Sequence, residues 1–346
     1  MSIDIKKSFY ELNYNDLVQV MDLQSFNKSA ANLLFNWHYK KKQNIECITD
    51  LAKETRSFLD QNYSFDLPEI DYVHESRDKT VKFLFKLKDD LQVETVLIPF
   101  KNRYSICLSS QVGCAMKCSF CSTGTQGFKR NLTTDEIVGQ YLEVYRWLDL
   151  NRPGDGKILN IVFMGQGEPL HNFDAVKKAC EIFIDQAGSS VATQKITVST
   201  SGYLPGLKRW LNEMPRVNIA LSLHSPIKSK RDELIPINKN YPLQEVLSFI
   251  DDIPLRKKQF VMYEYLLIDG LNDTEEDAHE TAKLLLGKEA HINLIPFNPF
   301  PGAKYKRPSE ERLMQFKLVL DTYHIPVLIR TTKGDDVLAA CGQLKT

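Results

Sequence analysis

The sequence has no long hydrophobic run and nothing that resembles a secretion signal. None of its 346 residues lies in an uninterrupted apolar stretch of the roughly 18 residues that a membrane-spanning helix requires. The start, MSIDIKKSFYELNYNDL, is polar and acidic, whereas a signal peptide begins basic and continues apolar. Seven cysteines, an odd number spread over a long chain, do not make a disulfide framework and are typical of a reducing compartment. We therefore expect a cytoplasmic protein that does not contact a membrane.

The sequence also lacks an excess of charge of either sign. Lys+Arg and Asp+Glu both number 44, so the formal net charge is zero. This balance excludes a protein that holds nucleic acid by bulk electrostatic attraction alone, but it leaves room for local basic patches. Two such patches are the lysine run 40–42 and the pair Lys129 and Arg130. Each patch alone is more typical of a solvated surface than of a binding site, so both remain hypotheses for phosphate contacts.

From about residue 104 the sequence alternates between β-branched apolar runs and amphipathic helical runs. Such alternation predicts βαβ units around a parallel sheet, and six to seven units favour a full or partial (β/α) barrel over a short open sheet. The fold class that we expect is therefore α/β, with functional groups at the C-terminal ends of the barrel strands. The predicted strands are 104–109, 158–164, 195–200, 217–223, 260–268, 292–297 and 325–330, and the predicted helices include 135–150, 173–188, 243–253, 275–288 and 311–324.

The first part of the chain has a different pattern. Segments 17–23, 30–39 and 48–61 are predicted to be helical, and segments 79–90 and 92–100 are predicted to form a hairpin that leads into the barrel. We expect residues 1–90 to form a small N-terminal helical accessory domain, with the hairpin as linker, that helps to bind a macromolecular substrate such as RNA. Residues 91–346 are then expected to form the barrel core.

Three cysteines in the string GCAMKCSFC carry the most specific signal. Cys114, Cys118 and Cys121 have the spacing C-x3-C-x2-C and follow the first predicted barrel strand. A tetrahedral zinc site requires four ligands, and so does a 4Fe–4S cluster held by protein alone. Three thiolates would leave one iron of such a cluster open to a substrate or a second cofactor. The alternative is a zinc knuckle completed by a distant ligand such as Cys107 or a histidine, but the spacing and the aromatic Phe120 favour the cluster.

A glycine-rich motif, MGQGEP (164–169), follows the second predicted strand. Its glycines allow the backbone to approach a ligand closely, and its carboxylate can accept hydrogen bonds from an ammonium group. Alone, the string is equally typical of an ordinary strand-to-helix turn. The cysteine triplet resembles that of radical S-adenosylmethionine (SAM) enzymes, and beside it this motif would be a clamp for the amino group of SAM.

Polar residues also end later strands. Segment 199–201 closes the third strand, segment 222–224 closes the fourth, and Asn298 follows the sixth. Each of these alone is more typical of a cap or a loop. At successive strand ends, however, hydroxyl, imidazole and amide groups favour a binding pocket for a ribose and a carboxylate.

The remaining cysteines divide into two kinds. Cys47 and Cys180 are interpreted as small buried hydrophobic residues. Cys341, in the polar and glycine-flanked string GDDVLAACGQL, follows the last predicted strand, so its thiol is expected near the barrel mouth, where it can act as a nucleophile. Cys107 lies on the first barrel strand, seven residues before the triplet, and supplies a second thiol.

Together these strings resemble the RlmN-type dual-specificity RNA methyltransferases of the radical SAM superfamily. The resemblance extends from about residue 28 to residue 344, and strings of this length in this order are highly specific. They are SSQVGCAMKCSFCSTGTQGFKRNL (109–132), GEPLHN (167–172), VSTSG (198–202), ALSLHSP (220–226), PIN (236–238), INLIPFNPFPG (292–302) and GDDVLAACGQL (334–344). The segment from about residue 29 to residue 59 is similar to the family's N-terminal helical RNA-binding domain.

The resemblance implies methylation of C2 of an adenosine in 23S rRNA, at the peptidyl-transferase centre, and of the adenosine beside the anticodon in some tRNAs. C2 of adenine is not nucleophilic, so radical chemistry is required, and the family uses two SAM molecules per turnover. One SAM methylates the cysteine matching Cys341; the second, bound to the cluster, is cleaved to a radical that takes a hydrogen from this methyl group. The resulting methylene radical adds to the adenine, Glu94 removes the C2 proton, and Cys107 forms a transient disulfide with Cys341 to release the product.

The same resemblance implies the cofactor residues and the partners. Cys114, Cys118 and Cys121 would hold the 4Fe–4S cluster, with SAM at its fourth site. The expected partners are 23S rRNA, tRNA and a reductant such as a flavodoxin system, and we expect a monomer. The residues that match the family's SAM contacts are Gly167, Glu168, Ser199, Ser222, Leu223, His224 and Asn298.

Two departures and three alternatives accompany this resemblance. Gln166 stands where the family usually has an apolar residue, often methionine, and is predicted to alter the packing beneath SAM; the chain also ends five residues after Cys341, whereas many relatives have a longer tail. A Cfr-type enzyme that modifies C8 of the same adenine is the nearest alternative, although GEPLHN and PFNPFPG are more typical of the C2 branch. An inactive RNA-binding module with a structural cluster would not need Glu94, Cys107 and Cys341. The third alternative is a zinc-binding RNA adaptor.

Overall fold

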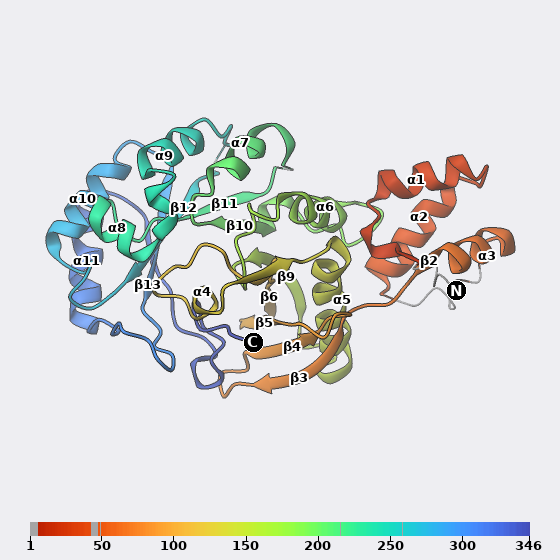
Figure 1. Ribbon diagram of the computed structural model, residues 1–346, viewed down its shortest axis with the longest axis horizontal. Helices are drawn as coiled ribbons and strands as arrows, with labels where there is room; N and C mark the ends of the chain where they lie inside the picture. The colour runs from red at the N-terminus through yellow and green to blue at the C-terminus, as the bar shows by residue number, and fades with distance from the viewer. Residues whose placement is uncertain (1–5, 43–47, 49, 215, 258) are drawn as a thin grey trace.

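The computed structural model describes residues 6–42, 48, 50–214, 216–257 and 259–346. A large curved sheet with helices around it forms one end of the molecule, and a small group of helices projects at the other end (Figure 1). No helix within these residues is both long enough and apolar enough to cross a membrane.

The projecting group contains three helices, α1 (Tyr14–Leu23), α2 (Ser29–Phe35) and α3 (Lys53–Asn62). A π-helical turn, Asn36–Lys40, extends α2, so the predicted helices at 17–23 and 30–39 are both present. A short parallel pair, β1 (Lys7–Ser8) with β2 (Tyr63–Ser64), joins the start of this region to its end. The third helix begins five residues later than predicted, while residue 49 of that prediction and Cys47 lie outside the described residues.

The core of this helical group contains a histidine that burial keeps neutral. His38 has no exposed surface, and its ring stacks on Phe65 with ring centroids 5.2 Å apart. Its Nδ1 lies 3.2 Å from the hydroxyl of Tyr10. Burial, with a smaller contribution from the charge of Arg146, lowers the pKa of His38 from 6.5 to about 3.

We therefore predict that His38 makes the fold acid-sensitive. Because the folded-state pKa is depressed, the unfolded chain binds a proton below pH 6.5 that the folded chain does not, so stability present above pH 6.5 is lost as the pH falls toward 3. Between pH 7 and pH 5 this contribution amounts to about 2 kcal/mol. Urea unfolding of the wild type and of His38→Phe at both values measures it. An equal pH dependence of the unfolding free energy in the two proteins would contradict the assignment.

The large sheet has ten strands in the order β14-β13-β12-β11-β10-β9-β6-β5-β4-β3. Neighbouring strands from β6 to β14 pair in parallel, which confirms the predicted α/β barrel, and the linear order leaves the barrel open between β14 and β3. These strands are β6 (Arg103–Cys107), β9 (Lys157–Phe163), β10 (Ile196–Thr200), β11 (Asn218–Ser222), β12 (Val261–Leu267), β13 (Ala290–Pro296) and β14 (Val327–Ile329).

The predicted hairpin adds antiparallel strands to the same sheet. β4 (Val81–Lys86) pairs with β5 (Gln92–Phe100), and β5 pairs with β6. A further edge strand, β3 (Glu69–Glu75), pairs with β4 and was not predicted, because most of its residues are exposed and give no apolar alternation. β3 and β4 thus lie in the same sheet as the barrel strands, and the division of the chain at residue 90 stays a prediction.

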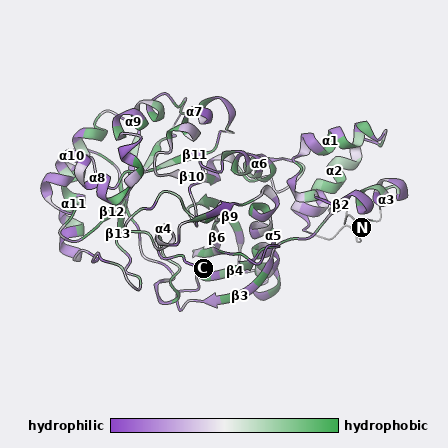
Figure 2. Ribbon diagram, in the orientation of Figure 1, coloured by the Kyte–Doolittle hydropathy of each residue, from purple (hydrophilic) through white to green (hydrophobic). Residues whose placement is uncertain are grey.

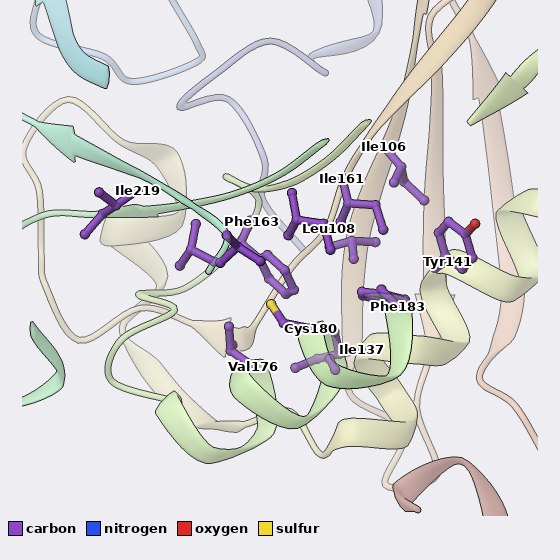
Figure 3. Close-up of a cluster of buried hydrophobic side chains, with 14 of the residues drawn as sticks. Ile106, Leu108, Ile137, Tyr141, Ile161, Phe163, Val176, Cys180, Phe183 and Ile219 are labelled. Carbon is purple, nitrogen blue, oxygen red and sulfur yellow. The ribbon is translucent and has the colours of Figure 1, made fainter. Parts of the chain in front are cut away.

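Helices pack around the barrel strands, and hydrophilic and hydrophobic residues alternate along them (Figure 2). Figure 3 shows how α6 contributes Val176, Cys180 and Phe183 to a buried cluster beneath Phe163 of β9. Cys180 is fully buried there, which confirms its interpretation as a small hydrophobic residue. The surrounding helices are α5 (Thr134–Asn151), α6 (Phe173–Ile184), α7 (Leu204–Glu213), α8 (Lys228–Leu234), α9 (Leu243–Asp251), α10 (Glu275–Leu285) and α11 (Glu310–Thr322).

Candidate active site

A cavity opens at the C-terminal ends of the parallel strands. It collects side chains from the cysteine loop, from the glycine-rich turn after β9 and from the ends of β10 to β13, as expected for a barrel of this type. The chemically active groups among its lining residues are Cys114, Cys118, Cys121, Glu168, Ser199, Ser201, Ser222, His224, Glu264 and Cys341.

The cysteine loop is held on a small ribbon of its own. β7 (Gln111–Gly113) pairs antiparallel with β8 (Phe128–Asn131), and the loop and the short helix α4 (Ser122–Gln126) lie between these two strands. The amide of Cys121 donates to the carbonyl of Cys118 over 3.2 Å, and the amide of Ser119 donates to the carbonyl of Leu234 at the end of α8 over 3.1 Å. The loop is therefore anchored both within itself and to the barrel.

The three thiols of the loop fit a 4Fe–4S cluster in number and placement. All three line the same cavity. Three thiolates bind three irons of such a cluster and leave the fourth open, whereas a tetrahedral zinc ion requires a fourth ligand. Burial raises the pKa of the Cys114 thiol to about 12, so a bound metal would be needed to keep it ionised. Cys107, the suggested fourth zinc ligand, lines a neighbouring cavity instead.

Gly124 makes the close packing of this loop possible. A β-carbon at this position would stand 2.8 Å from the carbonyl oxygen of Cys118, closer than real Cβ contacts allow. We predict that Gly124→Ala displaces the cysteine loop and lowers the iron content of anaerobically reconstituted protein severalfold, while the far-UV circular dichroism stays unchanged. Gly270→Ala is a matched control, because a β-carbon there meets no atom within 4 Å, although its φ of 68° makes it mildly strained. Equal iron contents in both variants would contradict this account.

Glu168 lies in the turn after β9 and is almost fully buried. One carboxylate oxygen accepts from the amide of Leu170 over 3.1 Å, and the other accepts from the amide and the hydroxyl of Ser201, each over 2.8 Å. Glu168 thus ties its turn to the end of β10 while still facing the cavity. Burial raises the pKa of this carboxyl group, so a cationic ligand beside it would stabilise its charged form.

His224 presents one defined tautomer. Its Nδ1 accepts a hydrogen bond from the amide of Leu266 over 3.0 Å, so the neutral ring carries its proton on Nε2. Burial lowers the pKa of His224 to about 3, which keeps the ring neutral at ordinary pH. The side chain lines the cavity, where the Nε2–H group is a donor for a ligand oxygen.

The other predicted SAM contacts are distributed over two places. Gly167, Ser199 and Ser222 line this cavity together with Glu168 and His224. Leu223 is fully buried and contributes no lining surface, whereas Asn298 lines the neighbouring cavity.

Sequence reasoning missed two buried charged residues at this site. Glu264 on β12 lines the cavity and accepts from the hydroxyl of Ser199 over 2.7 Å. Arg231 on α8 donates to the backbone carbonyls of Ser222 over 2.6 Å and Ser201 over 2.9 Å, and so fixes the ends of β11 and β10. The available signals were a lone acid inside the apolar strand VMYEYLLI and an arginine shortly before PIN, whose Asn238 accepts from Arg231 over 3.0 Å.

A second cavity adjoins the first and contains both remaining thiols. Cys107, at the end of β6, lies in its wall, and Cys341 lies in the walls of both cavities. Both cysteines are free. Burial raises the pKa of Cys107 to about 12, whereas the nearby Cys341 and Glu264 raise the pKa of Arg330 in the same cavity. The structure therefore brings the two predicted partner thiols together beside a guanidinium group.

Glu94 lies on β5 beneath the C-terminal segment and lines neither of the two cavities. One of its oxygens is 2.9 Å from Nζ of Lys82, and the other accepts from the amide of Lys345 over 2.8 Å. The C-terminus lies near α4 and β5 (Figure 1). In this arrangement the carboxylate is engaged by the protein itself, which sequence reasoning did not anticipate.

The residues of the two basic patches differ in their surroundings. Arg130 pairs with both Asp89 and Glu136, so its guanidinium is already engaged by two carboxylates. Lys42 lies over the ring of Tyr145, 3.2 Å from its centroid, and burial lowers its pKa to about 8. Lys129 remains exposed. The hypothesis of phosphate contacts is therefore weakened for Arg130.

Comparison with known proteins identifies similar chains over most of this length. Residues 108–285 match the model of the family described as the radical SAM superfamily. A protein of Aquifex aeolicus (strain VF5), named "Probable dual-specificity RNA methyltransferase RlmN", is 44% identical over 322 residues, covering 91% of this chain and 90% of that protein. A "Dual-specificity RNA methyltransferase RlmN" of Marinomonas sp. (strain MWYL1) is 40% identical over 351 residues, covering 99% and 94%.

A solved structure agrees with these relatives. The crystal structure of a radical SAM methyltransferase from Sphaerobacter thermophilus superposes with a TM-score of 0.90 at 36% identity, covering 98% of this chain and 99% of the other. The likeness therefore includes the N-terminal helices as well as the barrel.

Proposed function

From its membership of the radical SAM superfamily and, within it, of the RlmN-type dual-specificity RNA methyltransferases, we propose that this enzyme methylates C2 of an adenosine. The proposed substrates are one adenosine of 23S rRNA at the peptidyl-transferase centre and the adenosine beside the anticodon in some tRNAs. The observation that carries the proposal is the placement of Cys341 in the walls of two adjoining cavities, one with the cysteine triplet and the other with Cys107.

The triplet Cys114, Cys118 and Cys121 would hold a 4Fe–4S cluster, and SAM would occupy its fourth coordination site. Bound together, they supply the one-electron chemistry that an unreactive C–H bond of adenine requires. On the protein side, the buried carboxylate of Glu168 can orient an ammonium group, and the Nε2–H of His224 can donate to an anionic or ribose oxygen. A ligand that carries an ammonium group at one end and such an oxygen at the other would be held at both ends by these two side chains.

Cys341 would carry the methyl group on its sulfur, and Cys107 would resolve the product by forming a disulfide with it. Such exchange requires that the attacking sulfur reach the carrier sulfur, and both thiols line one cavity. Because burial holds Cys107 protonated at ordinary pH, a base or a nearby cation must assist its ionisation. Arg330 in the same cavity supplies such a cation.

Glu94 would take the proton from C2. Its carboxylate, close to Lys82 and the amide of Lys345, is shielded from water, and an adenine must be unstacked to reach this depth. The accessory role of the N-terminal helices in holding RNA, a flavodoxin-type reductant, the monomeric state and a cytoplasmic location complete the proposal.

Mass spectrometry of nuclease digests tests this function. The anaerobically reconstituted enzyme is incubated with SAM, a reductant and unmodified 23S rRNA or tRNA. We expect 2-methyladenosine in one or both RNAs. An 8-methyladenosine product would instead assign the chain to the Cfr-type reaction. Absence of any methylated adenosine, from protein with a full complement of iron, would overturn the proposal.

A further inference from the structure

Glu94 lies in a part of β5 that extends beyond the end of its neighbouring strand, β6. The pairing of β5 with β6 ends at Val96 and Cys107, while β5 continues back to Gln92. On the side that β6 would have occupied, the peptide groups of Glu94 have no strand partner. Unpaired backbone groups in a buried position are costly, so other groups must satisfy them.

Two polar side chains take the place of the missing strand. The amide of Glu94 donates to Oε1 of Gln166 over 2.9 Å, and the carbonyl of Glu94 accepts from the hydroxyl of Ser109 over 2.5 Å. The amide of Gln166 in turn donates to the Ser109 hydroxyl over 2.9 Å. Gln166 has no exposed surface and does not line the cofactor cavity, although the glycines on both sides of it do, so its effect on the packing beneath SAM stays a prediction.

The other end of the Gln166 side chain reaches the segment that covers Glu94. Its Nε2 donates to Oε1 of Gln126 on α4 over 3.3 Å, and the amide group of Gln126 donates to the carbonyl of Thr346. The neighbouring Lys345 donates its backbone amide to the Glu94 carboxylate. Gln166 is therefore hydrogen-bonded directly to the backbone of Glu94. Through Gln126 it is also connected to Lys345 and Thr346, the C-terminal residues that cover the Glu94 carboxylate.

We propose that Gln166 is a positioning residue for Glu94, which rests on the proposed function of Glu94 as the base. A methionine, which the resemblance gives as common at this position, has only a weakly accepting sulfur and no donor, so it cannot replace either hydrogen bond. In this chain the glutamine fixes the backbone of β5 at Glu94 and, through Gln126, supports the C-terminal residues that bind the Glu94 carboxylate. Gln166 acts through Glu94 and touches neither cofactor nor substrate.

Amide hydrogen exchange tests the contact without any turnover. In Gln166→Met the amide of Glu94 is expected to exchange about tenfold faster, since one lost hydrogen bond changes local opening by about that factor. Gln140→Met is the matched control: Gln140 is equally buried, but its Oε1 accepts from the amide of Ser109 over 2.9 Å. Because Gln140 reaches Glu94 only indirectly, through Ser109 and Thr95, the control should accelerate exchange mainly at Ser109 and at Glu94 clearly less than Gln166→Met does. Fast exchange at Glu94 in the wild type would overturn the proposal without any variant.

A second readout separates positioning from general destabilisation. We expect Gln166→Met to form about tenfold less methylated adenosine per SAM cleaved, because radical formation does not use Glu94 while proton removal does. Gln140→Met should keep the wild-type ratio of product to SAM cleaved. Equal ratios in wild type and Gln166→Met would overturn the positioning role. A wild-type enzyme that cleaves SAM without methylating adenosine would instead overturn the proposed function, leaving the exchange result as the test of the contact.

Discussion

Cys341→Ala is expected to abolish the formation of methylated adenosine, with a loss of at least about a thousandfold, because it removes the sulfur that we propose as the carrier of the methyl group. The variant should retain its iron–sulfur cluster, since Cys341 is separate from the triplet Cys114, Cys118 and Cys121. Mass spectrometry of digested RNA measures the product, and iron content and visible absorption measure the cluster. A variant that loses its cluster would not test the carrier role, so both measurements are made on the same sample.

Cys180→Ala is the matched control for this experiment. Its thiol is also free and is packed in the core beneath Phe163 (Figure 3), and it lines neither of the two cavities. We expect it to destabilise the fold by about 1 kcal/mol through the lost contacts and to retain methylation. Methylated adenosine produced by Cys341→Ala at the wild-type rate would show that the methyl group reaches RNA without this sulfur.

Much of the site could be predicted from sequence because its residues stand in short, ordered strings. The cysteine spacing, MGQGEP (164–169) and the polar strand ends each place a functional group directly after a predicted strand, and in a parallel barrel such positions converge on one face. The structure brings the triplet, Glu168 and His224 to one cavity. The local pattern was therefore enough to predict these site residues, because the parallel topology of the barrel brings the ends of its strands together.

The parts that could not be predicted depend on contacts between distant segments. Arg231 on α8 binds backbone carbonyls at the ends of two strands, and no local pattern marks a carbonyl as an acceptor. Gln166 was noticed as a departure, but its hydrogen bond to the backbone of Glu94 was not foreseen, because the two residues lie 72 positions apart in the sequence. β3 was missed because an exposed edge strand has no apolar periodicity. In each case the structure of the residue or strand depends on a partner that is distant in the sequence and not on its sequence neighbours.

Glu94→Gln is expected to lower methylation by about a hundredfold to ten-thousandfold, the usual effect of removing a general base. The amide oxygen of glutamine can still accept from the amide of Lys345, so the C-terminal segment should stay in place. The geometry allows two roles for this carboxylate: it can accept a proton, and it can anchor the C-terminal segment through the amide of Lys345. The substitution removes the first role and keeps the second. SAM cleavage should continue at the wild-type rate, and only product formation should fall.

Lys82→Met supplies the opposite perturbation. It keeps the carboxylate of Glu94 but removes its ion-pair partner, 2.9 Å away and largely buried with it, so the folded state should lose about 3 kcal/mol. We expect the ratio of methylated adenosine to SAM cleaved to stay within about tenfold of the wild type, because the proton acceptor remains. If Glu94→Gln kept full methylation while Lys82→Met lost it, Glu94 would be an anchor and the proton of C2 would leave by another group. A loss confined to Glu94→Gln assigns the base, because the two variants disturb the same pair and only one of them removes the group that can take a proton.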